Sequence, residues 1–348
     1  MIRSLLAGVA LVALASTAHA EEELNALVWC DHADPGLLEP FESANNVKVN
    51  VREYEGTGVA LALLEQSQPG DWDVFVIDGI DVGRVVDRGL LAELPRDQLP
   101  MDTIFPAVRM EEQNGRDGKL YAMTEKFGYN TIAYNKEKVD PADMTDVGTL
   151  FSDKYAGRMA IYDYYLPVMG MVQMARGGKT ADMTAEDVAA MQPDLFTLKE
   201  NSEGVLGVVA AQTALATGEV DIVVGGGEWL TAVLSEDKPE LDWTIPETGA
   251  VRWTQSIGVF ADSTKQDLAL KFVQYILSPE GQARLATSSC YWAMPANAAA
   301  GDVLTAAQKT ALRWDQQDDY LANTQLYPAP DEDLDLEMQD AWAEMLQH

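Results

Sequence analysis

Residues 24–41 read LNALVWCDHADPGLLEPF and contain the first strand and the first helix that the sequence predicts. The mostly apolar run from Leu24 to Trp29 is typical of a buried strand. Asp34 followed by Pro35 predicts the start of a helix, because Asp is a favoured N-cap and Pro fits the first helical turn. A strand that leads directly into a helix is the beginning of an α/β arrangement.

The same alternation continues downstream of this stretch. Residues 47–51 alternate between valine and polar side chains, which is the period of a strand. We expect a helix over 59–64, a strand buried on both faces over 73–77, and a further helix over 79–91. Strands that alternate with helices in this way predict a parallel sheet.

The pattern starts again after residues 129–135, YNTIAYN, which predict a strand that crosses into a second lobe. Within that lobe we expect strands over 159–162 and 220–224, and a strand over 256–261 that returns to the first lobe. Apolar residues at helical spacing predict two later helices, over 268–277 and 334–346.

The ends of these strands are candidate cleft positions. Residues 29–32 follow the first strand, and Asp78 follows the strand over 73–77. In the second lobe, residues 163–165 and 225–229 occupy equivalent positions. Because ligands of parallel sheets bind beyond the carboxyl ends of the strands, we expect these segments to face a ligand.

The N-terminus has the features of a secretory signal peptide. Arg3 supplies a positive charge, residues 5–15 form an apolar stretch too short to cross a bilayer, and residues 16–20 contain a small-residue cleavage pattern. The mature chain then begins near Glu21 and keeps about 328 of the 348 residues, enough for two domains with separate cores. Export of this kind predicts a periplasmic location, and no other stretch has the apolar length that a membrane span requires.

The predicted organisation therefore has three parts. Residues 1–20 form the signal peptide, and residues 24–128 with 255–300 form lobe 1. Residues 129–254 with 301–348 form lobe 2. The ligand cleft is expected between the two lobes.

The composition is that of a packed and strongly acidic protein. Apolar residues make up 47% of the chain, which argues against disorder. The formal net charge of −32 repels nucleic acid and anionic lipid and attracts cations, so nucleic acid is not an expected partner. Adaptation of a whole proteome to salt explains the acidity equally well, and the charge alone therefore names no ligand.

The sequence lacks the motifs of common hydrolases. It contains neither a GxSxG nor an HExxH pattern, and its three histidines are His19, His32 and His348. Because His19 lies in the signal peptide, too few histidines remain for a zinc site or for histidine-based acid–base catalysis. We therefore expect a binding protein, with no enzyme activity, no metal and no cofactor.

A set of motifs in the same order as in a known family extends over the predicted mature chain. They are LVWCDHADPGLLEPF (27–41), DWDVFV (71–76), IAYNK (132–136), YAGR (155–158), GEVD (218–221), ILSPE (276–280) and CYWAMPAN (290–297). Together they resemble the periplasmic spermidine/putrescine-binding proteins. This resemblance implies a monomer with a type II periplasmic binding protein fold. The two α/β lobes of such a protein close on a ligand by a hinge motion, and the protein then delivers the ligand to the membrane permease of an ABC transporter.

The resemblance also implies a set of ligand-binding residues. Members of the family hold the methylene groups of the ligand between aromatic rings and its ammonium groups on carboxylates, which suits the physics of a desolvated cation. The positions that this implies, two of which depart from the family pattern, are Trp29, Asp31, Asp78, Glu228, Trp253, Gln255 and Tyr291. Asp78 adds a carboxylate where Ser or Thr is usual, and Gln255 replaces a ligand-binding aspartate. Structural roles stay open for Trp29 as a core residue, Asp31 as a helix cap and Tyr291 as loop packing.

The predicted function is the substrate-binding component of an ABC importer for a small organic amine, with putrescine or another di/polyamine as the leading ligand. The alternative is a zwitterionic amine such as an amino acid, an opine or a betaine. Gln255 suits such a ligand, and Arg252 or Lys126 would then receive its carboxylate. A ferric-ion binder is a further alternative, because ferric binders use a tyrosine pair, although Tyr164–Tyr165 lies earlier in the chain than theirs.

Cys30 and Cys290 are the two cysteines of the chain. After export into an oxidising compartment such a pair is a disulfide candidate, with two separate buried thiols as the alternative. The resemblance places their neighbours Trp29 and Tyr291 at the same cleft, and we therefore expect a disulfide with Cα atoms within about 7 Å of each other.

Overall fold

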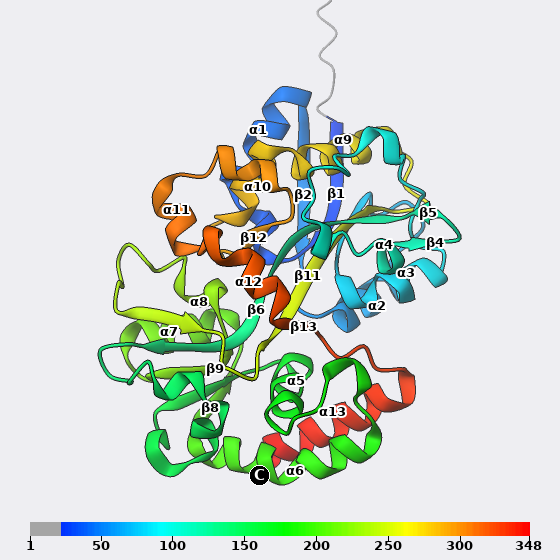
Figure 1. The fold of residues 1–348 in the computed structure, drawn as a ribbon. Coiled ribbons are helices and arrows are strands. Elements are labelled where there is room, and N and C mark those ends of the chain that lie inside the picture. The colour runs from blue at the N-terminus through cyan, green and yellow to red at the C-terminus, as the bar shows by residue number, and fades with distance from the viewer. Residues whose placement is uncertain (1–21) are drawn as a thin grey trace, which may run out of the picture.

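The computed structural model describes residues 22–348, so the predicted signal peptide lies outside the described residues. Its main sheet has the strand order β2-β1-β3-β11-β6-β9-β7-β8, with β10, β12 and β13 paired along its sides. Figure 1 shows two lobes stacked one above the other, with β6 and β11 running between them. Within the described residues, no helix is long and apolar enough to cross a membrane.

Lobe 1 begins with the parallel strands β1 (Glu22–Val28), β2 (Val47–Glu53) and β3 (Val74–Asp78). Helix α1 (Pro35–Asn45) starts as predicted, because the Asp34 carboxylate accepts the Gly36 backbone N–H at 2.7 Å. Helix α2 (Thr57–Glu65) follows β2.

The helix predicted over 79–91 is shorter in the structure. A 3₁₀ turn over Gly79–Asp81 leads into α3 (Val82–Asp87). Gly89 then adopts a φ of +70°, a left-handed conformation that ends a helix and that glycine takes without steric cost.

Two long strands connect the lobes. β6 (Ala122–Asn135) and β11 (Ala250–Val259) pair antiparallel, and every residue of both strands is buried. Toward its start β6 also pairs with β12 (Met294–Pro295), whereas its last residues pair with β9 and β10. Both strands begin before the segments that the sequence predicted, because burial on all sides leaves them without an alternating pattern.

Lobe 2 contains the parallel strands β7 (Met159–Tyr162), β8 (Ser202–Leu206) and β9 (Ile222–Gly226), and β10 (Leu241–Thr244) pairs antiparallel with β6. Its helices are α5 (Tyr165–Ala175), α6 (Ala185–Asn201), α7 (Val208–Thr217) and α8 (Glu228–Thr231). The C-terminal helix α13 (Glu332–Gln347) packs along α6 in the lower lobe (Figure 1).

The remaining elements are short or lie near the C-terminus: α4 (Glu111–Asn114), β4 (Gly115–Arg116), β5 (Lys119–Leu120), α9 (Gln266–Leu277), α10 (Pro279–Ala286), α11 (Ala306–Ala311), α12 (Gln317–Ala322) and β13 (Thr324–Leu326). The segment after residue 300 contacts both lobes. Trp314 packs against Phe105 in lobe 1, whereas Arg313 pairs with Asp242 in β10. The predicted lobe boundary at residue 300 stays a prediction.

Candidate functional site

A pocket with aromatic walls lies between the lobes. Its rings belong to Trp29, Tyr162, Tyr164, Trp229, Trp253, Tyr291 and Tyr327. Asp78, Asn130 and Gln255 supply its polar groups, and Val208 completes the lining. Apolar walls with a few placed polar groups are typical of small-molecule sites.

The strands of both lobes deliver these side chains at their carboxyl ends, as the sequence analysis expected. Trp29 follows β1, Asp78 ends β3, Tyr162 ends β7, and Trp229 lies just beyond β9 in α8. Trp253 and Gln255 come from β11, which runs between the lobes, and Tyr291 precedes β12. The pocket is thus assembled from both lobes at the edge where ligands of parallel sheets bind.

Asp78 is the only carboxylate among the described residues that line the pocket. Its Oδ2 accepts a hydrogen bond of 3.0 Å from the Tyr164 hydroxyl, which comes from the opposite lobe. Burial, followed by the nearby Asp81 carboxylate, raises the pKa of Asp78 to about 7, against the effect of the Tyr164 hydrogen bond. A cation beside this carboxylate would relieve both penalties.

Trp253, Gln255 and Tyr291 form one side of the pocket. The Gln255 amide donates to the Tyr291 hydroxyl at 2.8 Å, and the Trp253 and Tyr291 rings meet edge to face at 6.2 Å. The Oε1 of Gln255 and the Nε1 of Trp229 are buried without a hydrogen-bond partner among residues 22–348. Buried polar atoms normally have a partner, so both atoms are available to a ligand.

Asp31 does not line the pocket. It is fully buried, with Oδ2 at 2.8 Å from the Lys126 ammonium and Oδ1 at 2.9 Å from His32 Nδ1. His32 Nε2 in turn lies 2.9 Å from Glu125, so Glu125, His32, Asp31 and Lys126 form a chain of alternating charge that we call the buried tetrad.

The ion pairs of the buried tetrad favour the charged forms of Asp31 and His32, whereas burial raises the pKa of Glu125. Burial acts against ionisation of Asp31, but Lys126 and His32 hold the pKa of Asp31 below its usual range. Burial also acts against protonation of His32, but Glu125 and Asp31 together raise the pKa of His32 to about 10. Burial lowers the pKa of Lys126, and the ion pair with Asp31 opposes this effect.

A β-bulge explains how two adjacent strand residues join the same tetrad. The register of β6 against β11 shifts between Gln255 and Ser256, which face Lys126 and Thr124, so Glu125 is the extra residue. Successive side chains of a regular strand point to opposite faces, and a bulge changes that direction locally.

Glu228 also lies outside the pocket lining. At the start of α8, its Oε1 accepts the Tyr129 backbone N–H at 2.9 Å, and its Oε2 has no partner among the described residues. Burial raises the pKa of Glu228 to about 8. The group is therefore mostly neutral at pH 7 and adds little charge to the site.

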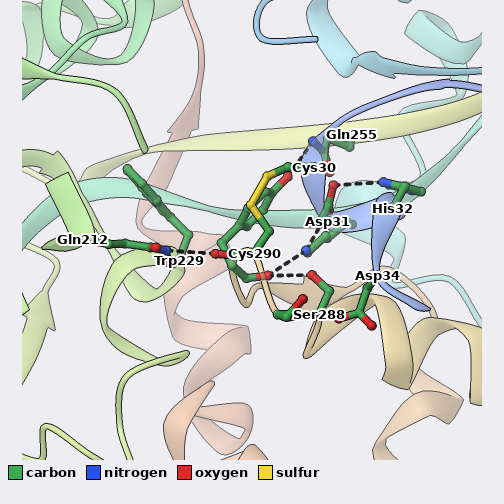
Figure 2. Close-up of a disulfide and its surroundings, with 12 residues drawn as sticks. Cys30, Asp31, His32, Asp34, Gln212, Trp229, Gln255, Ser288 and Cys290 are labelled. Atoms are coloured by element: carbon green, nitrogen blue, oxygen red, sulfur yellow. Dashed lines mark hydrogen bonds and ion pairs between the residues drawn. A yellow bond between two sulfur atoms is a disulfide. The ribbon is translucent and has the colours of Figure 1, made fainter. Parts of the chain in front are cut away.

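The predicted disulfide is confirmed: Cys30 and Cys290 are bonded, with their Cα atoms 6.0 Å apart. Figure 2 shows the disulfide beside Asp31, and Gln212 of lobe 2 extends toward the backbone of Cys290. The Gln212 amide, on α7, donates to the Cys290 carbonyl oxygen at 3.0 Å.

Of the seven ligand-binding positions predicted from the sequence, the structure brings five to the pocket: Trp29, Asp78, Trp253, Gln255 and Tyr291. Of the two tyrosines considered for iron, Tyr164 also lines the pocket. Tyr165 does not line it, because its hydroxyl donates to Asp335 at 2.5 Å. Tyr162 and Trp229 stand at or beside strand ends that the sequence had marked as cleft positions. Nothing local marks Tyr327, which reaches the pocket from the segment between β13 and α13.

Residues 22–348 contain no group of three or more His, Cys, Asp or Glu side chains that could hold a metal ion.

Comparison with known proteins gives a consistent result. The model of the bacterial extracellular solute-binding protein family matches residues 36–312. The spermidine/putrescine-binding periplasmic protein of Escherichia coli K12 is 24% identical over 296 residues, which is 83% of each chain. The structure of a putative spermidine/putrescine ABC transporter from Listeria monocytogenes superposes with a TM-score of 0.82 at 21% identity, over 93% of this chain and 98% of that one. The Atu4243-GABA receptor has a TM-score of 0.74 at 18% identity, over 94% and 98%.

Proposed function

The chain belongs to the bacterial extracellular solute-binding proteins, and from this premise we propose that it captures a small organic amine for an ABC importer. In this proposal the ligand is held in the pocket between the lobes and passed to a membrane permease. The signal-peptide pattern in residues 1–20 and the periplasmic relatives support export to the periplasm.

The observation that carries the ligand class is Asp78 within its set of aromatic rings. An ammonium group there would gain a charge-assisted hydrogen bond to the carboxylate and contact with the negative faces of the rings. The unpartnered Oε1 of Gln255 adds a second acceptor. We propose Asp78 as the counter-ion of the ligand, with Trp29, Trp253 and Tyr291 as its apolar contacts.

Putrescine or another di/polyamine was the leading ligand of the sequence analysis, and the curated relatives named for spermidine, putrescine or agmatine support an organic amine as the ligand class. The zwitterionic alternative has support from the fold of the GABA receptor, but its expected cationic partners are engaged elsewhere. Lys126 pairs with Asp31, and Arg252 donates to the Leu321 carbonyl oxygen at 3.3 Å. Neither lines the pocket, so we favour an amine without a carboxylate.

The test is a thermal-shift and calorimetric screen of the mature protein against monoamines, diamines, polyamines, amino acids and betaines. We expect at least one amine to raise the melting temperature, because a ligand that binds the folded state stabilises it by mass action. Asp78→Asn should abolish this shift. Asp87→Asn, the same change at an exposed acid outside the pocket, is the matched control. If no amine shifts the melting temperature, the proposed ligand class is wrong.

A further inference from the structure

The charges around the pocket are nearly all satisfied by the protein itself. Among the described residues that line it, Asp78 carries the only acidic side chain, and none is a lysine or an arginine. Glu228 is buried behind it and mostly neutral at pH 7, and the Asp31 carboxylate is held by Lys126 and His32. Among the described residues, the site therefore presents to a ligand one carboxyl group that has no cationic partner, that of Asp78.

Lys126 occupies the kind of environment that a bound ammonium would require. Its Nζ lies 2.8 Å from Asp31 Oδ2, 3.3 Å from the Tyr291 carbonyl oxygen and 4.0 Å from the centroid of the Tyr291 ring. A carboxylate together with an aromatic ring is the same combination that Asp78 and the rings of the pocket offer to a ligand. The Tyr291 ring takes part in both environments, because it lines the pocket and also lies against the Lys126 ammonium.

We propose that Lys126 is a specificity-determining residue that selects an organic amine with a single positive charge. Its ammonium contacts the Tyr291 ring of the pocket wall and occupies the place beside Asp31 that a second ligand ammonium would otherwise take. This inference rests on the proposed function and deepens it. The buried tetrad is balanced in formal charge, with two acids and two bases, so it offers no net attraction to a second ammonium. A diamine would place its second ammonium where no free buried carboxylate receives it, which is unfavourable.

A wide groove that adjoins the pocket does not supply such a carboxylate. It shares Trp29, Tyr162 and Tyr164 with the pocket and is lined by several acids. None of these acids is buried. Three of them also pair with arginines of the same groove: Asp81 and Asp335 with Arg84 at 3.4 and 3.8 Å, and Asp87 with Arg116 at 2.9 Å. A second ammonium that reached this groove would meet screened surface charge, which contributes little.

The test compares three ligands with the same four-carbon chain: butylamine, 1,4-diaminobutane and 4-aminobutyrate. Calorimetry on the mature wild-type protein should show butylamine bound about tenfold or more tighter than either of the others, because each of those buries one unpaired charge. Tighter binding of 1,4-diaminobutane or 4-aminobutyrate would overturn the inference while leaving an amine-binding function in place. Absence of binding by all three would overturn the inference.

Lys126→Met tests the role of the side chain directly. Removal of the internal cation frees Asp31, so the affinity for 1,4-diaminobutane relative to butylamine should rise about tenfold or more. The double variant Asp31→Asn with Lys126→Met removes both charges and should keep the wild-type ranking. Equal ranking in the single variant and the wild type would refute the role of Lys126. If the single variant does not fold, the wild-type ligand series decides.

Discussion

The carboxyl group of Asp78 makes the proposed capture of an amine dependent on pH. Burial and Asp81 raise its pKa from 3.8 to about 7, so below pH 7 the ligand-free group is mostly protonated. A bound ammonium requires the ionised form, and binding therefore releases a proton in this range. We expect the affinity to fall about tenfold for each pH unit below about 7 and to level off above it.

Calorimetry from about pH 5.5 to about pH 8.5, in two buffers of different ionisation enthalpy, measures both the affinity and the proton release. Glu228→Gln is the matched control, because burial raises the pKa of Glu228 to about 8 but the group lies outside the pocket lining. That variant should keep the slope. The stability of the ligand-free protein should change with pH in the opposite direction to the affinity. Its free energy of unfolding should fall as the pH rises from about 4 to about 7, because the pKa of Asp78 is higher in the folded state than in the unfolded state. An affinity that does not change below pH 7 would contradict the assignment.

Gly128 in strand β6 has no side chain, and this leaves room for the side chains of Trp253 and Glu228 to pack against the strand. A Cβ atom there would lie 1.9 Å from Glu228 Oε1 and 2.6 Å from the Trp253 ring. We expect Gly128→Ala to lower the free energy of unfolding by about 1–3 kcal/mol, as overpacking of a core does, and to weaken amine binding by displacing Trp253.

Gly204→Ala in strand β8 is the matched control for this substitution. Its Cβ would meet only Leu206, at 3.8 Å, which is ordinary van der Waals contact. Urea unfolding and calorimetry of both variants should separate the two sites. If Gly128→Ala and the wild type have equal stability and affinity, β6 and Trp253 move to accommodate the added methyl group with no loss of unfolding free energy.

The disulfide between the loop after β1 and the loop before β12 joins residues 260 positions apart. In the chain-entropy model a cross-link over so long a loop stabilises the folded state by about 5 kcal/mol at most. We expect the Cys30→Ser, Cys290→Ser double variant to lose about 2–5 kcal/mol of unfolding free energy. Its affinity for the amine should fall as well, because the bond restrains the neighbours Trp29 and Tyr291.

Urea unfolding with and without dithiothreitol measures this contribution. The reductant should destabilise the wild-type protein toward the level of the double variant and leave the double variant itself unchanged. A wild-type protein whose unfolding does not respond to full reduction would speak against a stabilising role for the bond.

Closure of the two lobes is stabilised by contacts that need not touch a ligand. Gln212 on α7 donates across the cleft to the Cys290 carbonyl oxygen at 3.0 Å, and it does not line the pocket. A hydrogen bond of this kind contributes about 1 kcal/mol, so Gln212→Ala should weaken amine binding about fivefold. The ligand-free variant should also show a larger radius of gyration in small-angle scattering, because the open form gains population.

Gln192→Ala provides the comparison within one lobe. The Gln192 amide donates to the Ala341 carbonyl oxygen at 3.2 Å between α6 and α13, both in lobe 2. That substitution should leave the affinity and the scattering profile unchanged. Identical behaviour of the two variants would mean that the Gln212 contact does not couple to closure.

The sequence by itself determined the local structure and much of the fold. Alternation of strand and helix signals, the Asp34 cap and the crossing strand around residues 129–135 are all present in the structure, because each depends on neighbours only a few residues away. The strand ends marked Trp29, Asp78 and the segment of Trp229 as cleft positions for the same reason. The disulfide followed from a count of two cysteines and from the resemblance of their neighbours to a known family.

Only the tertiary structure decided which charges are free. Lys126 and Asp31 are 95 residues apart, and a bulge at Glu125 interrupts the strand alternation beside Lys126, so no local pattern predicts the pair. Burial by other elements raises the pKa of Glu228 to about 8, and Tyr327 enters the pocket from a segment with no cleft signal. Desolvation and ion pairing depend on every element packed around a group, and for this reason the residue types at the site were predictable whereas their charges were not.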